Sequence, residues 1–171
     1  VHSEPMRDDD HYCGGYREYW ENVGGFDGSR GPIEIHFIDE VIPGYFWLFP
    51  VKEGVVNVGI GMVISEQRKQ KGADKSLKKK QRWVIENHPV FRERFKDARI
   101  VKGSQKGWQL PFGSPRKSPP SYQPRRSAGA GVMCVGDAAS LVDPFSGEGI
   151  GNGLVSAKMT SKYFDKDDHS G

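Results

Sequence analysis

A glycine-rich turn between a predicted strand and a predicted helix sets the strongest limit on how this chain can fold. It lies in VMCVGDAASLVDPFSGEGIGNGLVSAK, residues 132–158. The apolar residues 132–135 predict a buried strand, and the residues from Gly149 onward predict a helix. Gly136 permits a tight exit from the strand, and Asp137 follows at the carboxyl end, where ligands bind in open α/β sheets.

The start of the predicted helix is a second reason to expect a ligand. Backbone N–H groups at a helix start are unpaired and carry a partial positive charge, and glycines leave them accessible. The turn is therefore suited to an anion or a polarised carbonyl. Neither common phosphate motif fits, since there is no G-x-x-x-x-G-K-[ST], and Asn152 stands where G-x-G-x-x-G needs its last glycine. A turn that only lets a helix pack close to a sheet remains the alternative.

Length and composition narrow the class of protein. The 171 residues suit one domain, or one domain with a small appendage. No run of about 18 apolar residues and no signal peptide is present. Cys13 and Cys134 form no disulfide framework and no metal-ligand spacing, so a cytoplasmic protein is expected, with Cys134 as a buried thiol.

The net charge of +3 conceals a basic region at residues 66–106. Leu77, Val84 and Ile85 form an apolar stripe within a helix predicted over residues 74–87, which favours a solvated basic helix face over a nucleic-acid site. Attraction of this face to anionic lipid headgroups stays open.

The rest of the chain predicts mainly antiparallel strands. Residues 33–39 alternate, with Ile33, Ile35 and Phe37 on one face of a half-buried strand. Two further strand-like runs flank residues 52–54, as in a hairpin. A short helix is expected over residues 12–23, a second helix with Phe91 and Phe95 after Pro89, and a loop over residues 114–131.

The glycine-rich stretch resembles the second flavin-binding motif of the p-hydroxybenzoate hydroxylase-type flavoproteins. Within that superfamily the chain is more similar to the geranylgeranyl reductase family. The similarity includes PGYFWLFP at residues 43–50, NVGIGM at residues 57–62, and the spacing of Gly107, Pro111 and Pro115. It extends over residues 12–164, although Pro43 is one residue closer to Tyr45 than in some members.

The resemblance implies FAD as cofactor. Asp137 would accept a hydrogen bond from a ribityl hydroxyl, the backbone of residues 147–151 would face the pyrimidine edge of the isoalloxazine, and Pro144 would shape the turn. The residues expected at the cofactor are Gly136, Asp137, Pro144, Gly147, Glu148, Gly149, Ile150 and Gly151. The substrate cavity would be lined by Tyr45, Trp47 and Phe49, for which ordinary core packing is the alternative.

The function implied is an FAD-dependent oxidoreductase that transfers hydride from reduced flavin to carbon–carbon double bonds of a polyprenyl lipid. No side chain stands out as a proton donor, so the catalytic residues are unknown and the flavin would carry the chemistry. The expected partners are an isoprenoid or other apolar substrate, NAD(P)H or ferredoxin as electron donor, and a membrane surface, with no nucleic acid. A monooxygenase or halogenase of the same superfamily, and a truncated piece without activity of its own, are the alternatives.

The chain departs from the family by lacking the first strand, the G-x-G-x-x-G turn and the helix that hold the FAD adenosine, so a fragment is expected. The predicted fold class is α+β / α/β. It combines an antiparallel substrate-domain sheet carrying helices with the C-terminal strand–turn–helix of an FAD-binding domain. The predicted division is a leading segment at residues 1–30, a substrate domain at 31–115 and part of an FAD-binding domain at 116–171.

Overall fold

The computed structural model describes residues 9–26, 31–52, 54–70, 76–112, 116–118, 121–123 and 127–163. The fold is mixed α+β, with an antiparallel sheet and several helices, as predicted. The chain divides into two compact units. One comprises Gly14–Gln109, and the other comprises Val1–Cys13 with Leu110–Gly171.

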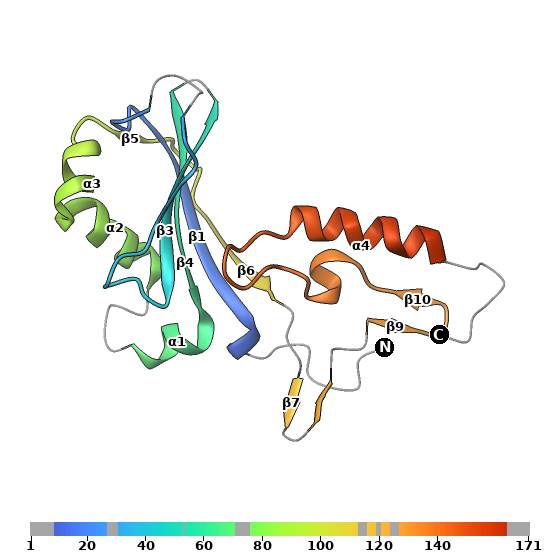
Figure 1. Ribbon diagram of the computed structural model, residues 1–171. Helices are drawn as coiled ribbons and strands as arrows, with labels where there is room; N and C mark the ends of the chain where they lie inside the picture. The colour runs from blue at the N-terminus through green and yellow to red at the C-terminus, as the bar shows by residue number, and fades with distance from the viewer. Residues whose placement is uncertain are drawn as a thin grey trace. The chain divides into compact units, whose positions relative to one another are not determined.

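The Gly14–Gln109 unit is built on one sheet. Its strands follow the order β2 (Glu34–His36), β3 (Gly44–Lys52), β4 (Val55–Val63), β1 (Tyr12–Glu21) and β5 (Arg99–Ile100), and β6 (Lys106–Pro111) also pairs with β1 (Figure 1). The predicted hairpin is confirmed: β3 and β4 are antiparallel, with Phe46 opposite Ile60 and Leu48 opposite Val58. The β2–β3 and β1–β5 pairs are antiparallel as well.

Helices cover one face of this sheet (Figure 1). The short α1 (Ile64–Lys69) follows β4 directly, whereas α2 (Leu77–Asn87) and α3 (Pro89–Arg94) supply the apolar cover. The predicted stripe of α2 is buried, and the Phe91 ring of α3 lies 4.8 Å from that of Phe46. Alternate side chains of the hairpin complete this core, namely Phe46, Leu48, Val56, Val58, Ile60 and Met62.

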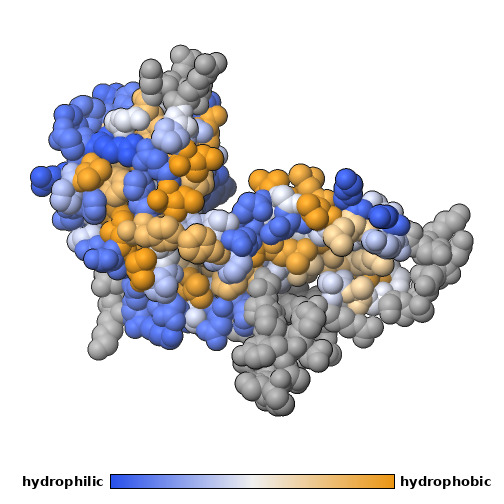
Figure 2. Space-filling model, in the orientation of Figure 1, coloured by the Kyte–Doolittle hydropathy of each residue, from blue (hydrophilic) through white to orange (hydrophobic). Residues whose placement is uncertain are grey.

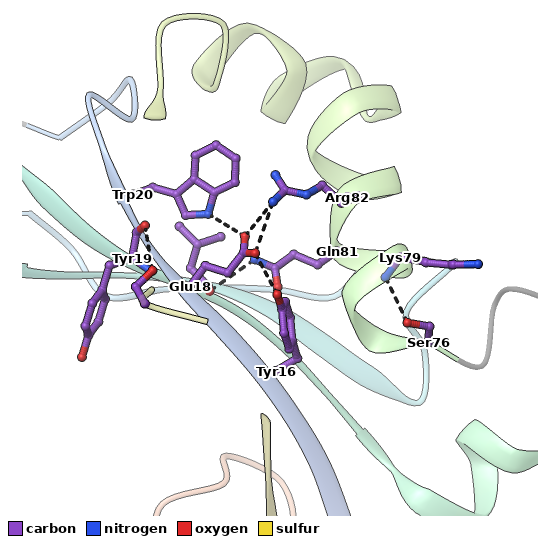
Figure 3. Close-up of polar contacts among 10 residues, drawn as sticks. Tyr16, Glu18, Tyr19, Trp20, Ser76, Lys79, Gln81 and Arg82 are labelled. Carbon is purple, nitrogen blue, oxygen red and sulfur yellow. Dashed lines mark hydrogen bonds and ion pairs between the residues drawn. The ribbon is translucent and has the colours of Figure 1, made fainter. Parts of the chain in front are cut away.

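The helix predicted over residues 12–23 was wrong, because this segment is strand β1. Its alternation is masked in the sequence by Glu18, a carboxylate on the buried face whose residue is 1% exposed. Four donor contacts compensate for its burial (Figure 3). The Tyr16 hydroxyl donates to Oε1 at 2.8 Å, the Trp20 indole to Oε2 at 3.2 Å, and Arg82 Nη2 of α2 to the two oxygens at 3.2 and 3.3 Å.

The strand predicted over residues 33–39 is shorter, and its apolar face is not in the core. Only Glu34–His36 form β2, while Ile33, Ile35 and Phe37 are 71%, 40% and 56% exposed. The polar side chains face α3 instead. Arg94 bonds both oxygens of Glu34, at 2.6 and 3.0 Å. The helix layer thus takes the charged side of β2 and leaves its apolar side open.

The other unit combines strands of two or three residues and short 3₁₀ helices with one helix of 14 residues. These are η1 (Asp9–His11), β7 (Arg116–Ser118), β8 (Ser121–Gln123), β9 (Ala128–Gly129), β10 (Val132–Met133), η3 (Gly136–Ala139) and α4 (Ile150–Tyr163). The predicted helix is confirmed as α4. The expected loop over residues 114–131 contains the antiparallel pair β7–β8.

The buried strand predicted at residues 132–135 is a two-residue strand paired with β9, and Val132 and Met133 are 49% and 45% exposed. Cys134 is likewise only partly buried. None of the described helices combines the length and the apolar character that crossing a bilayer requires.

Candidate functional site

The glycine-rich turn is fastened to α4 through Gly136. This residue has φ +54°, a left-handed conformation that favours glycine. Its N–H donates to Ser156 Oγ at 3.1 Å, and a Cβ added to it would lie 3.3 Å from the Gly153 Cα. Because Gly136 and Gly153 have no side chains, the backbone that follows the strand can lie directly against the backbone of α4.

The same turn brings Asp137 and Gly149 together. A Cβ on Gly149 would lie 3.3 Å from Asp137 Oδ1 and 3.1 Å from Val142 Cγ2. Asp137 is exposed, and its carboxylate accepts no hydrogen bond from the described residues. A free acceptor thus lies beside the start of a helix, although twelve positions separate the two residues along the chain.

Residues 143–148 form a tight loop around one carboxylate. Asp143 Oδ1 accepts from the Phe145 N–H at 3.1 Å and from the N–H and hydroxyl of Ser146, each at 2.7 Å. These bonds, above all those from Ser146, hold the pKa of Asp143 below its usual value. Pro144 lies exposed in this loop, and Gly147 closes it with φ +73°. Asp143 is therefore a structural residue that shapes the turn.

The start of α4 offers open amides next to one that is capped. The Glu148 carboxylate accepts from the Gly151 N–H at 2.5 Å, which satisfies one first-turn donor. The N–H groups of Gly149 and Ile150 donate to no described residue. The sequence predicted only that the backbone of Glu148 would face the cofactor. Its side chain also caps the start of the helix.

The three predicted substrate residues lie on the sheet face away from the helices. Along β3, Tyr45, Trp47 and Phe49 alternate with the buried Phe46 and Leu48. Neighbouring rings are close, with centroids 5.9 Å apart for Tyr45–Trp47 and 6.0 Å for Trp47–Phe49, the latter pair stacked.

Side chains of β2 extend this surface. Phe37 meets Tyr45 edge-on at 6.2 Å, and Ile35 lies directly opposite Trp47 across the strands. We call this surface the open face; its apolar members are Ile35, Phe37, Tyr45, Trp47 and Phe49.

Gly59 is a determinant of the open face that sequence reasoning missed. It lies opposite Trp47 on β4, and a Cβ there would come within 2.0 Å of Trp47 Cζ2. The indole therefore lies across the bare backbone of β4, and its Nε1 donates to Asn57 Oδ1 at 3.2 Å. Asn57 and Gly59 both belong to the NVGIGM segment of the resemblance, so the sequence did contain a signal for them.

The spacing of Gly107, Pro111 and Pro115, the third segment of the resemblance, forms few contacts in the part of the chain that the structure describes. A Cβ on Gly107 would lie 3.7 Å from the Gly15 carbonyl oxygen, and Pro111 is buried at the end of β6. Pro115 lies outside the described residues.

Comparison with known proteins identifies the family to which this chain belongs. A family model described as the geranylgeranyl reductase catalytic domain matches residues 14–102, which include the whole open face. The chain belongs to the geranylgeranyl reductase family. Its relatives are named as reductases, and the expected membership is confirmed.

Two curated relatives illustrate the range of this family. Digeranylgeranylglycerophospholipid reductase from Thermoplasma acidophilum is 33% identical over 141 residues, covering 78% of this chain and 31% of the relative. Menaquinone reductase from Mycolicibacterium smegmatis is 32% identical over 128 residues, covering 72% of this chain and 26% of the relative. The chain thus spans less than a third of the length of these two relatives.

Solved structures agree on the fold. A geranylgeranyl bacteriochlorophyll reductase-like protein from Thermoplasma acidophilum superposes with a TM-score of 0.71 at 25% identity, over 96% of this chain and 37% of that protein. A flavin-dependent brominase superposes with a TM-score of 0.59 at 18% identity, over 85% of this chain and 33% of its own length, which shows a common fold only.

Proposed function

We propose that this chain is the substrate-binding and flavin-ring-binding part of an FAD-dependent reductase that saturates carbon–carbon double bonds of a polyprenyl lipid. The observation that carries the proposal is the match of the catalytic-domain model to the residues that form the open face. In this proposal residues 31–115 supply the substrate sheet, and residues 116–171 supply the C-terminal part of the FAD-binding domain.

The residues of the turn suit an isoalloxazine. Reduced flavin carries negative charge near N1 and the C2 carbonyl, and the unpaired amides of Gly149 and Ile150 are donors for that edge. The free carboxylate of Asp137 is an acceptor for a ribityl hydroxyl, and Gly149 beside it leaves room for the approach. Gly136, Pro144, Gly147, Glu148 and Gly151 would shape this cradle.

The open face suits an apolar chain. Tyr45, Trp47 and Phe49 present aromatic surface to a tail without hydrogen-bonding groups, and the bond from Trp47 to Asn57 fixes the central ring. FAD supplies hydride to the double bond when it is bound and reduced. The side chains of the open face bind the tail, orient it and exclude water.

The reaction is tested with the FAD-loaded protein that contains this chain, reduced under anaerobic conditions and mixed with a geranylgeranyl lipid. Mass spectrometry should show products heavier by two hydrogen atoms per double bond reduced. A product that carries added oxygen or halogen, formed when air is admitted, would overturn the reductase assignment in favour of the monooxygenase or halogenase alternative.

The cofactor site has a separate test that uses two aspartates of the same turn. Asp137→Ala should lower the flavin retained after gel filtration about tenfold, because one hydrogen bond to the cofactor is lost. Asp143→Ala should lower it less, since Asp143 bonds only its own loop. Equal flavin content in the two variants, measured by absorbance after denaturation, contradicts the role of Asp137.

The electron donor and the membrane contact complete the proposal. NAD(P)H and ferredoxin are the two donor classes, and anaerobic flavin bleaching by one of them alone would distinguish them.

Peripheral contact with a bilayer follows from the substrate class, because polyprenyl lipids partition into membranes. The basic outer surface of α2, with Lys78 and Lys79 exposed, suits anionic headgroups.

A further inference from the structure

We propose that Arg17 binds the phosphate of a headgroup, so that the favoured substrate is a polyprenyl lipid with an anionic, phosphate-bearing head. The inference rests on the proposed function, because it takes the open face as the site of the tail. It assigns Arg17 as a residue that determines headgroup specificity.

Strand alternation places Arg17 on the open face. On β1, Glu18 and Trp20 are buried on the helix-covered side, where Arg82 of α2 bonds the Glu18 carboxylate. Arg17 and Tyr19 therefore point to the opposite side, which they share with Trp47. Only β4 separates β1 from β3, so the two strands lie about 10 Å apart across the sheet. An extended lipid can span that separation.

The guanidinium of Arg17 is held in place and keeps most of its donors. Its Nη1 donates to the Ser104 carbonyl oxygen at 2.6 Å, and its Cζ lies 4.3 Å from the centre of the Tyr19 ring. Ser104 is itself buried and accepts from the Tyr19 N–H at 3.0 Å. Because a guanidinium has five N–H donors, the fork remains available for a phosphate.

The charge of Arg17 also lacks an internal counterion. Arg82 and Arg94, on the covered face, are paired with Glu18 and Glu34. Within the ranges that the structure describes, no carboxylate forms an ion pair with Arg17.

The nearest acidic residue of β1 on this side is Glu21, which lies directly opposite Arg99 of β5. A cation without a counterion at the margin of an apolar surface matches a molecule with an apolar tail and an anionic head.

The test compares two ligands with the same tail, geranylgeranyl diphosphate and geranylgeraniol, by equilibrium dialysis against the oxidised, FAD-loaded protein that contains this chain. The protein should bind the diphosphate about tenfold more tightly than the alcohol. Arg17→Gln should abolish this preference and leave the Kd for the alcohol within about twofold. Arg17→Lys should keep part of it, because lysine keeps the charge and loses the fork.

Arg92→Gln is the matched control, since Arg92 is an exposed arginine on α3, to which no binding role is assigned. It should keep the full preference, whereas a loss of preference equal to that of Arg17→Gln would overturn the assignment. Unchanged binding of the alcohol shows that a variant is folded. Inorganic diphosphate should displace the prenyl diphosphate only at far higher concentration, and equal potency would also overturn the inference.

The outcomes distinguish a failure of the role of Arg17 from a failure of the proposed reductase function. Equal affinity of the unsubstituted protein for alcohol and diphosphate, or an intact preference in Arg17→Gln, overturns the role of Arg17 and leaves the reductase proposal standing. Failure of the protein to bind either prenyl ligand overturns both.

Discussion

The two faces of the main sheet differ in how their side chains are satisfied. On the covered face, Phe46 and Leu48 are fully buried, and the carboxylates of Glu18 and Glu34 are bonded by Arg82 and Arg94. On the open face, no described helix of the Gly14–Gln109 unit covers the row of aromatic rings (Figure 1), and no described carboxylate forms an ion pair with Arg17. The same strand, β3, thus contributes to the core with one side and presents half-buried aromatic rings, proposed to bind the substrate, on the other.

The largest effect should come from truncating the covered face. Phe46→Ala should lower the free energy of unfolding by about 3–5 kcal/mol, because it removes a buried ring and leaves a cavity. Phe49→Ala, the matched change on the open face, should cost about 1 kcal/mol, since that ring is only half-buried. Urea unfolding measures the two values. Equal losses would show that the open face is also part of the core.

The buried ion pair should come next. Arg82→Gln should cost about 2–3 kcal/mol, because it leaves the Glu18 carboxylate buried with only the Tyr16 and Trp20 donors. Lys96→Gln, which removes the exposed partner of Glu93, is the control and should leave the urea midpoint unchanged. An unchanged midpoint for Arg82→Gln would mean that Glu18 does not need its cation.

A smaller effect on stability, with a large effect on binding, is expected from Gly59→Ala. The added methyl group would occupy the place of the Trp47 ring, so the indole must turn away and lose its bond to Asn57, at about 1 kcal/mol. Near-ultraviolet circular dichroism should change, and geranylgeraniol binding should weaken. In a Trp47→Leu background the same glycine change should cost less, and additive losses would contradict the contact.

The smallest effect should appear only in alkali. Burial, followed by the hydrogen bond and charge of Glu18, raises the pKa of Tyr16 to about 12. Since the unfolded value is about 10, this contribution to stability is complete below pH 10 and is lost as the pH rises through about 12. Tyr16→Phe should remove that part of the pH dependence, measured as the urea midpoint between pH 9 and pH 12. An identical slope in both proteins would contradict the coupling.

Prediction from sequence succeeded where one face of an element is apolar throughout. The α2 stripe of Leu77, Val84 and Ile85 and the β3–β4 hairpin were predicted because their buried positions hold apolar residues at regular spacing. It failed at β1 because Glu18 interrupts the apolar alternation, and the cation that neutralises its buried carboxylate is the distant Arg82. Such a partner is not visible within a short window.

For β2 the period was correct but the direction was not. The apolar side of a half-buried strand was expected to be the buried one, whereas Ile35 and Phe37 lie on the open face and Ile33 is 71% exposed. The exposed side chains of β10 and α4 make the same point, and Figure 2 shows apolar surface along α4, where Ile150, Leu154 and Met159 are each more than half exposed. Hydrophobicity predicts that a surface will be covered, but not whether protein or ligand covers it.

For the candidate site, the family motif supplied the residues, whose roles at a cofactor stay a prediction, and the contacts that support the turn were not predictable. Asp137 and Gly149 were assigned through the family motif, and the structure brings them together. The bond from Gly136 to Ser156 and the cap by Glu148 depend on how the turn closes, which the order of residues alone does not fix.

The central claim is that the open face holds the polyprenyl tail. The most direct measurement is photoaffinity labelling of the FAD-loaded protein with a geranylgeraniol analogue that carries a diazirine in its tail, followed by peptide mapping. We expect label on β3 at Tyr45, Trp47 or Phe49, suppressed by excess geranylgeraniol. Label that is confined to α2 or α4 and suppressed by excess geranylgeraniol, with β3 unlabelled, would contradict this role of the open face.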